Sequence, residues 1–252
     1  MLLAAYTLWS REIVRFYRQR SRIVGALGTP LIFWVLIGSG LGQSFQAAPG
    51  VPLQGGYLEY FFPGTLALIL LFTAIFSTIS IIEDRQEGFL QGVMVAPVPR
   101  MAIVLGKILG GTTLAVMQGV IFLALAPLAH VHLRDFGDLA YLVVFVSFGL
   151  TGLGFLMAWL FDSTQGFHAI MNLVLFPMWI LSGALFPAAG AAGWVRAIML
   201  VNPLTYGVTA LQELLLNQAT AWPSLDVCLA VVGGFAILTL VAGAILVAKK
   251  AN

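Results

Sequence analysis

Long apolar runs separated by short polar segments dominate this chain. The runs cover residues 23–42, 60–82, 102–127, 139–161, 167–187 and 225–248. Each is about 20 residues or longer, enough for a helix to cross a hydrocarbon core of roughly 30 Å. Because lipid offers no hydrogen-bond partner to the backbone, each run must be helical. The pattern therefore predicts an all-α, polytopic membrane protein with six transmembrane helices.

The composition agrees with this prediction. Hydrophobic residues make up 60% of the 252 residues and charged residues only 9%, a balance that no soluble domain of this size needs. The single cysteine, Cys228, excludes a disulfide framework. The apolar start, Leu2–Trp9, is too short for a cleavable signal, and an arginine-rich run follows it. The segments between spans are short, so residues 1–252 are expected to form a single transmembrane domain.

The basic residues are divided unequally between the two sides of the membrane. With alternating sides, one side receives ten of the twelve Lys and Arg residues: Arg11, Arg15, Arg18, Arg20, Arg22, Arg85, Arg100, Lys107, Lys249 and Lys250. The other side receives Arg134 and Arg196. The positive-inside rule then places the N-terminus, the 83–101 loop and the C-terminus in the cytoplasm, which an even number of spans requires. We expect the protein in the cytoplasmic (inner) membrane of a bacterium.

Residues 1–22 have the pattern of an amphipathic helix on the membrane surface. Arginines occupy one face, and aromatic and aliphatic residues occupy the opposite face. The residues expected at this interface are Trp9, Arg11, Ile13, Arg15, Phe16 and Arg18. The segment either marks orientation by contacting lipids of the anionic leaflet, or serves as a collar that links the bundle to a cytoplasmic partner. Arg20 falls on the apolar side, which indicates a bend before the first span.

The segment 83–101 is longer than a connection between two helices requires. It reads EDRQEGFLQGVMVAPVPRM, with acids at its start and an apolar patch at helical spacing. Pro97 and Pro99 end the helix, because proline cannot donate a backbone hydrogen bond and restricts the residue before it. About two to eight residues would suffice to join two spans. The pattern therefore favours a short, rigid cytoplasmic helix that is presented to a soluble protein.

This segment resembles the signature of permease subunits of type-2 ABC exporters, which carry drugs, polysaccharides or lipids. The match consists of the acids at 83–87, the run EGFLQGVMVAPVPR and the later VLGK. SGALFP at 182–187 and NPLTYGVTALQELL at 202–215 resemble two further segments of that family, the second of them its outer re-entrant segment. Gln91 stands where an acid is common. The resemblance extends over the whole chain in order and spacing.

The resemblance implies the partners and an architecture. Two permease subunits, identical or related, would pair in the membrane, and residues 188–222 would form an outer re-entrant region. Each subunit would dock its 83–100 helix on one of two copies of a cytoplasmic ABC ATPase, which would bind ATP and Mg²⁺ and switch the bundle between inward and outward access. The residues expected at this coupling interface are Glu83, Asp84, Glu87, Phe89, Leu90, Gln91, Val93, Met94, Pro97 and Arg100.

The chain lacks a nucleotide-binding loop of its own. Such a loop needs G-x-x-x-x-G-K followed by Ser or Thr. Around the only Gly-Lys pair, Met101 stands in place of the first glycine and Ile108 in place of the hydroxyl residue. ATP hydrolysis is therefore expected on a partner. We expect this chain to bind membrane lipids, but no cofactor, metal or nucleic acid, and to have no catalytic residues.

Few polar residues fall inside the spans, where a charge costs at least about 2.5–3.5 kcal/mol at mid-depth. Glu213 lies in an apolar stretch, Asn172 and Ser182 can hydrogen-bond across helices, and Pro177 should kink the fifth span. These four residues are candidates for the transport pathway, and a packing role is the alternative for each. The mostly apolar interior favours an amphiphilic, hydrophobic or lipid-linked cargo over ions selected by charged rings.

Two other functions are alternatives. An intramembrane enzyme needs clustered acids, a histidine pair, or a nucleophile with a base, whereas this chain offers only His130, His132 and His168. A non-transporting scaffold that anchors an ATPase would share the cytoplasmic helix. Substrate-stimulated ATP hydrolysis in liposomes would separate an exporter from a scaffold.

Overall fold

The computed structural model describes residues 1–40, 56–133, 135–187, 191–216 and 223–249, with all their side chains except those of residues 20–23. This part of the chain is helical and contains no strand. The α-helices are α1 (Leu2–Arg18), α2 (Arg20–Gly40), α3 (Gly56–Ser77), α4 (Ile79–Gln86), α5 (Phe89–Val95), α6 (Arg100–Leu123), α7 (Phe136–Leu160), α8 (Thr164–Trp179), α9 (Gly193–Val201), α10 (Pro203–Leu216) and α11 (Leu225–Lys249). A 3₁₀ turn, η1 (Ala126–Ala129), follows α6, and a π-helical turn, η2 (Ile180–Ala184), ends α8.

The prediction of an all-α, polytopic membrane protein is confirmed. Five helical stretches among the described residues are long and apolar enough to cross a membrane: Gly56–Gln86, Arg100–Leu123, Phe136–Leu160, Thr164–Ala184 and Leu225–Lys249. They correspond to the second through sixth expected spans. The expected first span coincides with α2, whose apolar part, Val24–Gly40, is shorter, and residues 41 and 42 lie outside the described residues. The total of six spans therefore stays a prediction.

The N-terminal helix is shorter than the sequence indicates. A single helix was expected over residues 1–22, but α1 ends at Arg18 and Gln19 leaves helical geometry, with φ −102° and ψ 76°. The chain then restarts as α2 at Arg20. A bend was expected here, because Arg20 would fall on the apolar side of a continuous helix. The break separates the amphipathic helix α1 from the first apolar helix, α2.

The third span is also shorter than expected. Its apolar run continues to residue 127, but α6 ends at Leu123 and η1 follows with Pro127 in its first turn. Proline lacks a backbone N–H and cannot continue the α-helical hydrogen bonds. The short helix expected after the second span is present as α5, and it ends at Val95, two residues before Pro97.

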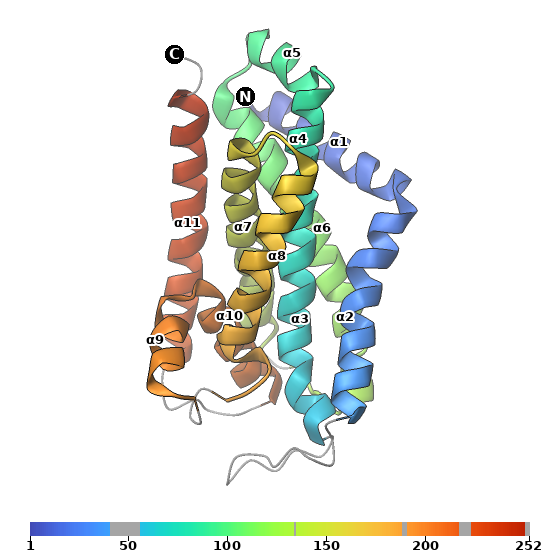
Figure 1. Ribbon diagram of the computed structural model, residues 1–252, viewed down its shortest axis with the longest axis vertical. Helices are drawn as coiled ribbons and strands as arrows, with labels where there is room; N and C mark the ends of the chain where they lie inside the picture. The colour runs from blue at the N-terminus through green and yellow to red at the C-terminus, as the bar shows by residue number, and fades with distance from the viewer. Residues whose placement is uncertain (41–55, 134, 188–190, 217–222, 250–252) are drawn as a thin grey trace.

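The two ends of the bundle differ (Figure 1). The start of α1, the end of α11 and α5 lie at one end, and α9 and α10 lie at the other. α1 lies across the bundle instead of along it. Arg100 at the start of α6 donates to the Ala248 carbonyl oxygen at 3.0 Å, so the ends of α6 and α11 are joined. The 83–101 loop and the C-terminal helix therefore meet at one end.

α3 is the centre of the bundle. It packs against α2, α6, α7 and α10, and 83% of the apolar window of the Gly56–Gln86 stretch is buried, more than in any other described span. No charged residue occurs between Tyr60 and Ile82, so every side of the helix can be buried without leaving a charge unpaired. Gly119 of α6 lets Leu70 approach closely, as small residues do where membrane helices meet.

Candidate functional site

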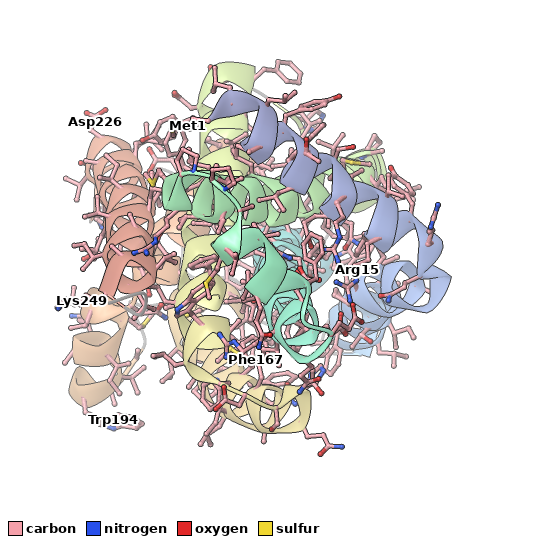
Figure 2. All side chains as sticks on the ribbon, turned by 90° about the horizontal axis from the view of Figure 1, so that it is seen from above. Met1, Arg15, Phe167, Trp194, Asp226 and Lys249 are labelled. Atoms are coloured by element: carbon pink, nitrogen blue, oxygen red, sulfur yellow. The ribbon has the colours of Figure 1, made fainter. Side chains whose placement is uncertain are left out.

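A cluster of ionised side chains joins α1, α4 and α6 at the end of the bundle that carries α5. Its centre is Asp84 on α4, which is 0% exposed. Arg11 donates to both carboxylate oxygens of Asp84, at 2.8 and 2.7 Å, and Arg15 donates to Oδ1 at 2.8 Å. Lys107 of α6 donates to Oδ2. Figure 2, seen from this end, shows nitrogen and oxygen atoms gathered near the labelled Arg15. One carboxylate thus holds cations from two other helices.

A second buried carboxylate, Glu12 on α1, completes the ionic cluster. Lys107 Nζ donates to Glu12 Oε1 at 2.5 Å and to Ser80 Oγ at 3.2 Å. Arg15 also donates to Glu83 Oε2 at 2.7 Å. Three cations therefore face three acids, which is the condition for keeping charges away from water. The hydrogen bond to Asp84 raises the pKa of Arg11 above its ordinary value, so this guanidinium remains charged.

Glycines on α6 allow α1 to approach closely enough for these ion pairs. A Cβ at Gly106 would lie 2.7 Å from the Cβ of Leu8 and 3.0 Å from the carbonyl oxygen of Ala5. A Cβ at Gly110 would lie 2.8 Å from the Cβ of Glu12. Only glycine fits at such distances without a shift of one helix. These two glycines of α6 therefore let α1 lie close to it.

α5 is attached to the same cluster. Gly88, with φ 78°, adopts the left-handed conformation that glycine reaches at little cost, and it turns the chain from α4 into α5. The Arg11 guanidinium carbon lies 3.8 Å from the centroid of the Phe89 ring, a cation–π contact. Leu90 is buried. The orientation of α5 is thus set by α1 as well as by its own chain connections.

A separate contact connects α4 to the end of α7. Arg85 donates to the carbonyl oxygens of Trp159 and Phe161, at 2.9 and 3.0 Å, and to Asp162 Oδ1 at 3.0 Å. The last carbonyls of a helix have no partner within it. Arg85 therefore satisfies the end of α7, and Gln86 adds a bond to the Asp162 carbonyl oxygen at 2.9 Å.

The ten residues expected at the coupling interface lie together on α4, α5 and the start of α6, but not all of them on the surface. Asp84 and Leu90 are buried, and Glu83, Phe89 and Val93 are half-buried. The exposed members are Glu87, Gln91, Met94, Pro97 and Arg100. Val95, which the sequence reading did not include, is 88% exposed. The side chains of Asp84 and Leu90 are occupied by the ionic cluster and by apolar packing below α5. The role of the ten residues in coupling stays a prediction.

Residues 4–216 match the family model described as ABC-2 type transporter, and this match covers the ionic cluster, α5, α9 and α10. The chain belongs to the ABC-2 type transporter family. It is a membrane permease of that family.

Relatives of this permease include proteins from several bacteria. It is 24% identical over 244 residues to the daunorubicin resistance ABC transporter permease protein DrrB1 of Streptomyces coeruleorubidus, covering 92% of this chain and 83% of the relative. It is 26% identical over 241 residues to nodulation protein J of Rhizobium meliloti (strain 1021), covering 90% and 88%. It is 27% identical over 188 residues to the inner membrane transport permease YhhJ of Escherichia coli (strain K12), covering 71% and 50%.

Sequence reasoning missed Glu12 of the permease. The position of Lys107 inside a span was a usable signal, because a buried ammonium needs a counter-charge. A second signal was the helical spacing of Glu12 from Ala5 and Leu8, which places the three residues on one face of α1. They are the buried residues of this helix. Arg11 and Arg15 are engaged by acids of the chain itself, and Arg18 is exposed.

The remaining residues expected at the membrane interface lie on α1. The Trp9 Nε1 donates to Thr113 Oγ1 of α6 at 3.0 Å, and Trp9, Ile13 and Phe16 are half-buried. The exposed apolar side chains of α1 are Leu2, Leu3, Tyr6, Val14 and Tyr17. The buried residues of the helix, Ala5, Leu8 and Glu12, face α6, and contact of the exposed face with lipid stays a prediction.

A cavity of about 500 Å³ lies between α2, α3 and α8 of the permease. Its apolar wall includes Phe33, Phe72, Phe76 and Phe176, and its polar lining includes Thr29, Thr73, Ser77, Thr164, His168 and Glu83. Asn172, one of the expected pathway residues, is exposed on α8 and falls between His168 and Phe176 on the same helical face.

The other expected pathway residues lie near the opposite end of the permease. Pro177 is inside the last turn of α8, and Ser182 is buried in η2, where its hydroxyl donates to the Trp179 carbonyl oxygen at 2.6 Å. Glu213 is half-buried on α10. Pro177 and Ser182 thus lie at the break at the end of α8, whereas Asn172 lies on the face of α8 that carries the cavity residues His168 and Phe176.

Proposed function

We propose that this chain is the membrane-spanning permease subunit of an ATP-driven exporter and that α5 docks on a separate cytoplasmic ABC ATPase. The ionic cluster around Asp84 is the observation that carries this proposal. The ion pairs of the buried Asp84 attach α4 to α1 and α6, and the contact of Arg11 with the Phe89 ring attaches α5 to α1. A force on α5 would move these helices together. It would also reach α3 at the centre of the bundle, because α4 follows α3 directly in the chain.

The exposed side of α5 would be the docking surface. Met94 and Val95 form an apolar tip, with Gln91 beside them and the charges of Glu87 and Arg100 at its edges. An apolar centre with a polar rim is the common organisation of a protein–protein contact. ATP and Mg²⁺ would bind to the ATPase, of which two copies serve a pair of permease subunits. Transport requires the ATPase to contact the two states of the permease differently.

The end that carries α5 would face the cytoplasm. Arg100 begins α6 and Lys249 ends α11, and these two helix ends meet at the bond from Arg100 to the Ala248 carbonyl oxygen. Arg18 ends α1, whose Arg15 belongs to the ionic cluster. This agrees with the excess of basic residues on one side of the pattern. α9 and α10 would then form the outer re-entrant region. We place the permease in the bacterial cytoplasmic membrane, and the name of the Escherichia coli relative, an inner membrane transport permease, supports this location.

The cavity between α2, α3 and α8 would be part of the cargo path. Phenylalanine side chains and hydroxyl groups line it together with His168 and Glu83, and Glu83 is paired with Arg15. It therefore suits an amphiphilic, hydrophobic or lipid-linked molecule better than an ion. α2 and α8 flank it, and a second permease subunit, a copy or a relative, would complete the wall. The relatives named for daunorubicin resistance and for nodulation are consistent with a role in export.

A pair of matched valine substitutions tests the docking surface. Val95→Asp places a charge on the exposed tip of α5, and Val201→Asp places the same charge on α9, where Val201 is 84% exposed, at the opposite end. The ABC ATPase that copurifies with the tagged wild-type permease is first identified by mass spectrometry. We expect Val95→Asp to lose this ATPase and Val201→Asp to retain it. Full retention by Val95→Asp would contradict the proposal.

A second measurement separates an exporter from a scaffold that only anchors an ATPase. A cysteine at Thr29, an exposed residue that lines the cavity, is labelled in the reconstituted complex with and without ATP and Mg²⁺. An exporter changes access to the cavity during its cycle, so the labelling rate should depend on ATP. A scaffold would show the same rate in both conditions.

A further inference from the structure

A buried break in the helical backbone follows α8 at the end of the bundle opposite α5. α8 contains Pro177, and the π-helical turn η2 that follows departs from helical geometry at Leu181 (φ −87°, ψ 20°) and Gly183 (φ 88°, ψ 4°). This break at the end of α8 is buried: Ser182, Gly183 and Ala184 are shielded from solvent. The carbonyl groups here lose their regular helical partners and need other donors.

Asn202, which precedes α10, supplies two of these donors. Its Nδ2 donates to the Met178 carbonyl oxygen at 2.6 Å and to the Leu181 carbonyl oxygen at 3.3 Å. Its Oδ1 accepts from the Leu204 backbone N–H at 3.0 Å. One buried side chain therefore caps the start of α10 with its oxygen and binds the break in α8 with its nitrogen.

Gly183 receives donors from two different helices. Gln212 Nε2 of α10 donates to its carbonyl oxygen at 3.1 Å, and the Tyr60 hydroxyl of α3 donates to the same oxygen at 3.3 Å. The Tyr57 hydroxyl donates to the Leu185 carbonyl oxygen at 3.0 Å. The break is thus enclosed by side chains of α3 and α10, which bind its backbone and not its side chains.

We infer that these side-chain donors form a latch that keeps the outer end of α8 closed, with Asn202 and Gln212 as positioning residues of the transport path. The inference rests on the proposed function, because it assigns the latch to the outer mouth of that path. The same helix α8 lines the cavity near the α5 end through His168 and Phe176. A shift of α8 at the cavity would therefore act directly on the latch.

The membrane environment explains why the break in α8 needs either protein donors or water. Non-helical backbone at membrane depth is tolerated where protein buries it or where it lines a water-filled cavity. The break in α8 satisfies the first condition through side chains of other helices. Separation of α10 from α8 would exchange those donors for water without unwinding either helix, which satisfies the second condition. The arrangement accordingly has two permitted states, closed and hydrated.

The test measures access to the break with a cysteine reporter. Ser182→Cys is made in a Cys228→Ala background, which removes the one native cysteine. Labelling with a membrane-impermeant maleimide is timed in intact cells and in inverted vesicles. Asn202→Ser keeps an oxygen that can cap α10 but is too short to reach the carbonyls of α8, and Gln212→Met removes the donor to Gly183 while keeping the side-chain length. Gln165→Met, an exposed change at the start of α8, is the matched control.

We expect slow labelling in the parent and in Gln165→Met, and a rate at least roughly fivefold higher in Asn202→Ser and Gln212→Met, as the loss of one neutral hydrogen bond predicts. Unchanged rates in both variants would overturn the latch. The latch would also be overturned if labelling stayed slow in Asn202→Ser but became fast in Asn202→Ala. Asn202 would then act only as the cap of α10. If either latch variant fails to reach the membrane, Tyr60→Phe, which loses one hydroxyl, decides by the same criterion.

The latch and the proposed function can be tested independently of each other. The assay needs neither cargo nor ATP, and copurification of the ATPase is measured on the same variants. Faster labelling from the cytoplasmic face alone would support the latch while contradicting the proposed orientation. Loss of the ATPase from the Val95→Asp variant, with unchanged labelling of the latch variants, would support the docking surface and overturn the latch.

Discussion

Lys107 Nζ on α6 donates to Glu12 Oε1 on α1 at 2.5 Å, and the two side chains are 3% and 6% exposed. The pair ties the N-terminal helix to the expected third span at a point where water is excluded. Its Coulomb attraction is therefore only weakly screened by salt. Removal of one partner would leave the other charge buried, which is the reason that the pair is a sensitive test of the ionic cluster.

Lys107→Met is expected to destabilise the permease strongly. Breaking a buried ion pair by removing one partner costs about 3–5 kcal/mol, because an uncompensated charge remains. The double substitution Glu12→Met with Lys107→Met removes both charges and should recover part of this loss. The free energy of unfolding of the purified permease in mixed micelles is the measurement. If the double variant lost the sum of the two single losses, the residues would not be coupled.

Gly106→Ala is expected to displace α1 from α6. The new methyl group would lie 2.7 Å from the Cβ of Leu8 and meet the backbone of Ala5, and overpacking of this kind costs about 1–3 kcal/mol. Faster maleimide labelling of a cysteine at position 5, which is buried in the parent, would report the displacement. Gly92→Ala on α5 is the control, because a Cβ there meets nothing within 4 Å. Equal labelling in both variants would show that α1 tolerates the methyl group.

Arg85→Lys is expected to loosen the junction between α4 and α7 although it keeps the charge. A lysine ammonium cannot reproduce the planar fork that reaches the carbonyl oxygens of Trp159 and Phe161. Loss of a hydrogen bond from a charged donor costs about 1.5–3 kcal/mol. The melting temperature of the purified permease should fall, whereas Arg18→Lys, at an exposed position, should leave it unchanged. Identical melting would mean that the end of α7 does not depend on the guanidinium.

Ala26→Trp is expected to fill the cavity between α2, α3 and α8. Ala26 lines this cavity, so the indole would occupy space now open to a ligand. Binding of Nile red, an uncharged dye that fluoresces in apolar sites, to the purified permease is the measurement, and it should weaken. Ala140→Trp, at an exposed position on α7, adds the same side chain outside the cavity and should leave dye binding as it is. Equal dye binding in the two variants would exclude the cavity as an apolar site.

Much of the fold could be predicted because a membrane leaves the chain few choices. The runs at 60–82 and 225–248 had to be helical, since lipid cannot satisfy backbone groups. Pro97 had to end the short helix after the second span, and the helix that begins at Phe89 does end before it. Pro177 indicated a disturbance in the fifth span, which appears as the break that follows it. Each of these inferences depends on local chemistry, which the residue order contains.

The ionic cluster could be predicted only in part. The acids at 83 and 84 and the arginines at 11 and 15 were visible as charged groups, and both sets were assigned to surfaces. In the folded protein Asp84 is buried between Arg11 and Lys107. Pairing between groups so far apart in sequence depends on how α1 crosses α6, and periodicity within one helix carries no information about that crossing.

The sequence by itself determined that this protein is an all-helical membrane protein, which helices are apolar, and that one side of the pattern is basic. Only the tertiary structure decided which charges face one another and which carbonyls need donors from elsewhere. Glu12 finds Lys107 across 95 residues, and Asn202 finds the break in α8 at Leu181. The physical reason is that helix formation is a local response to lipid, whereas the choice of a partner for a buried polar group depends on the packing of helices that are distant in sequence.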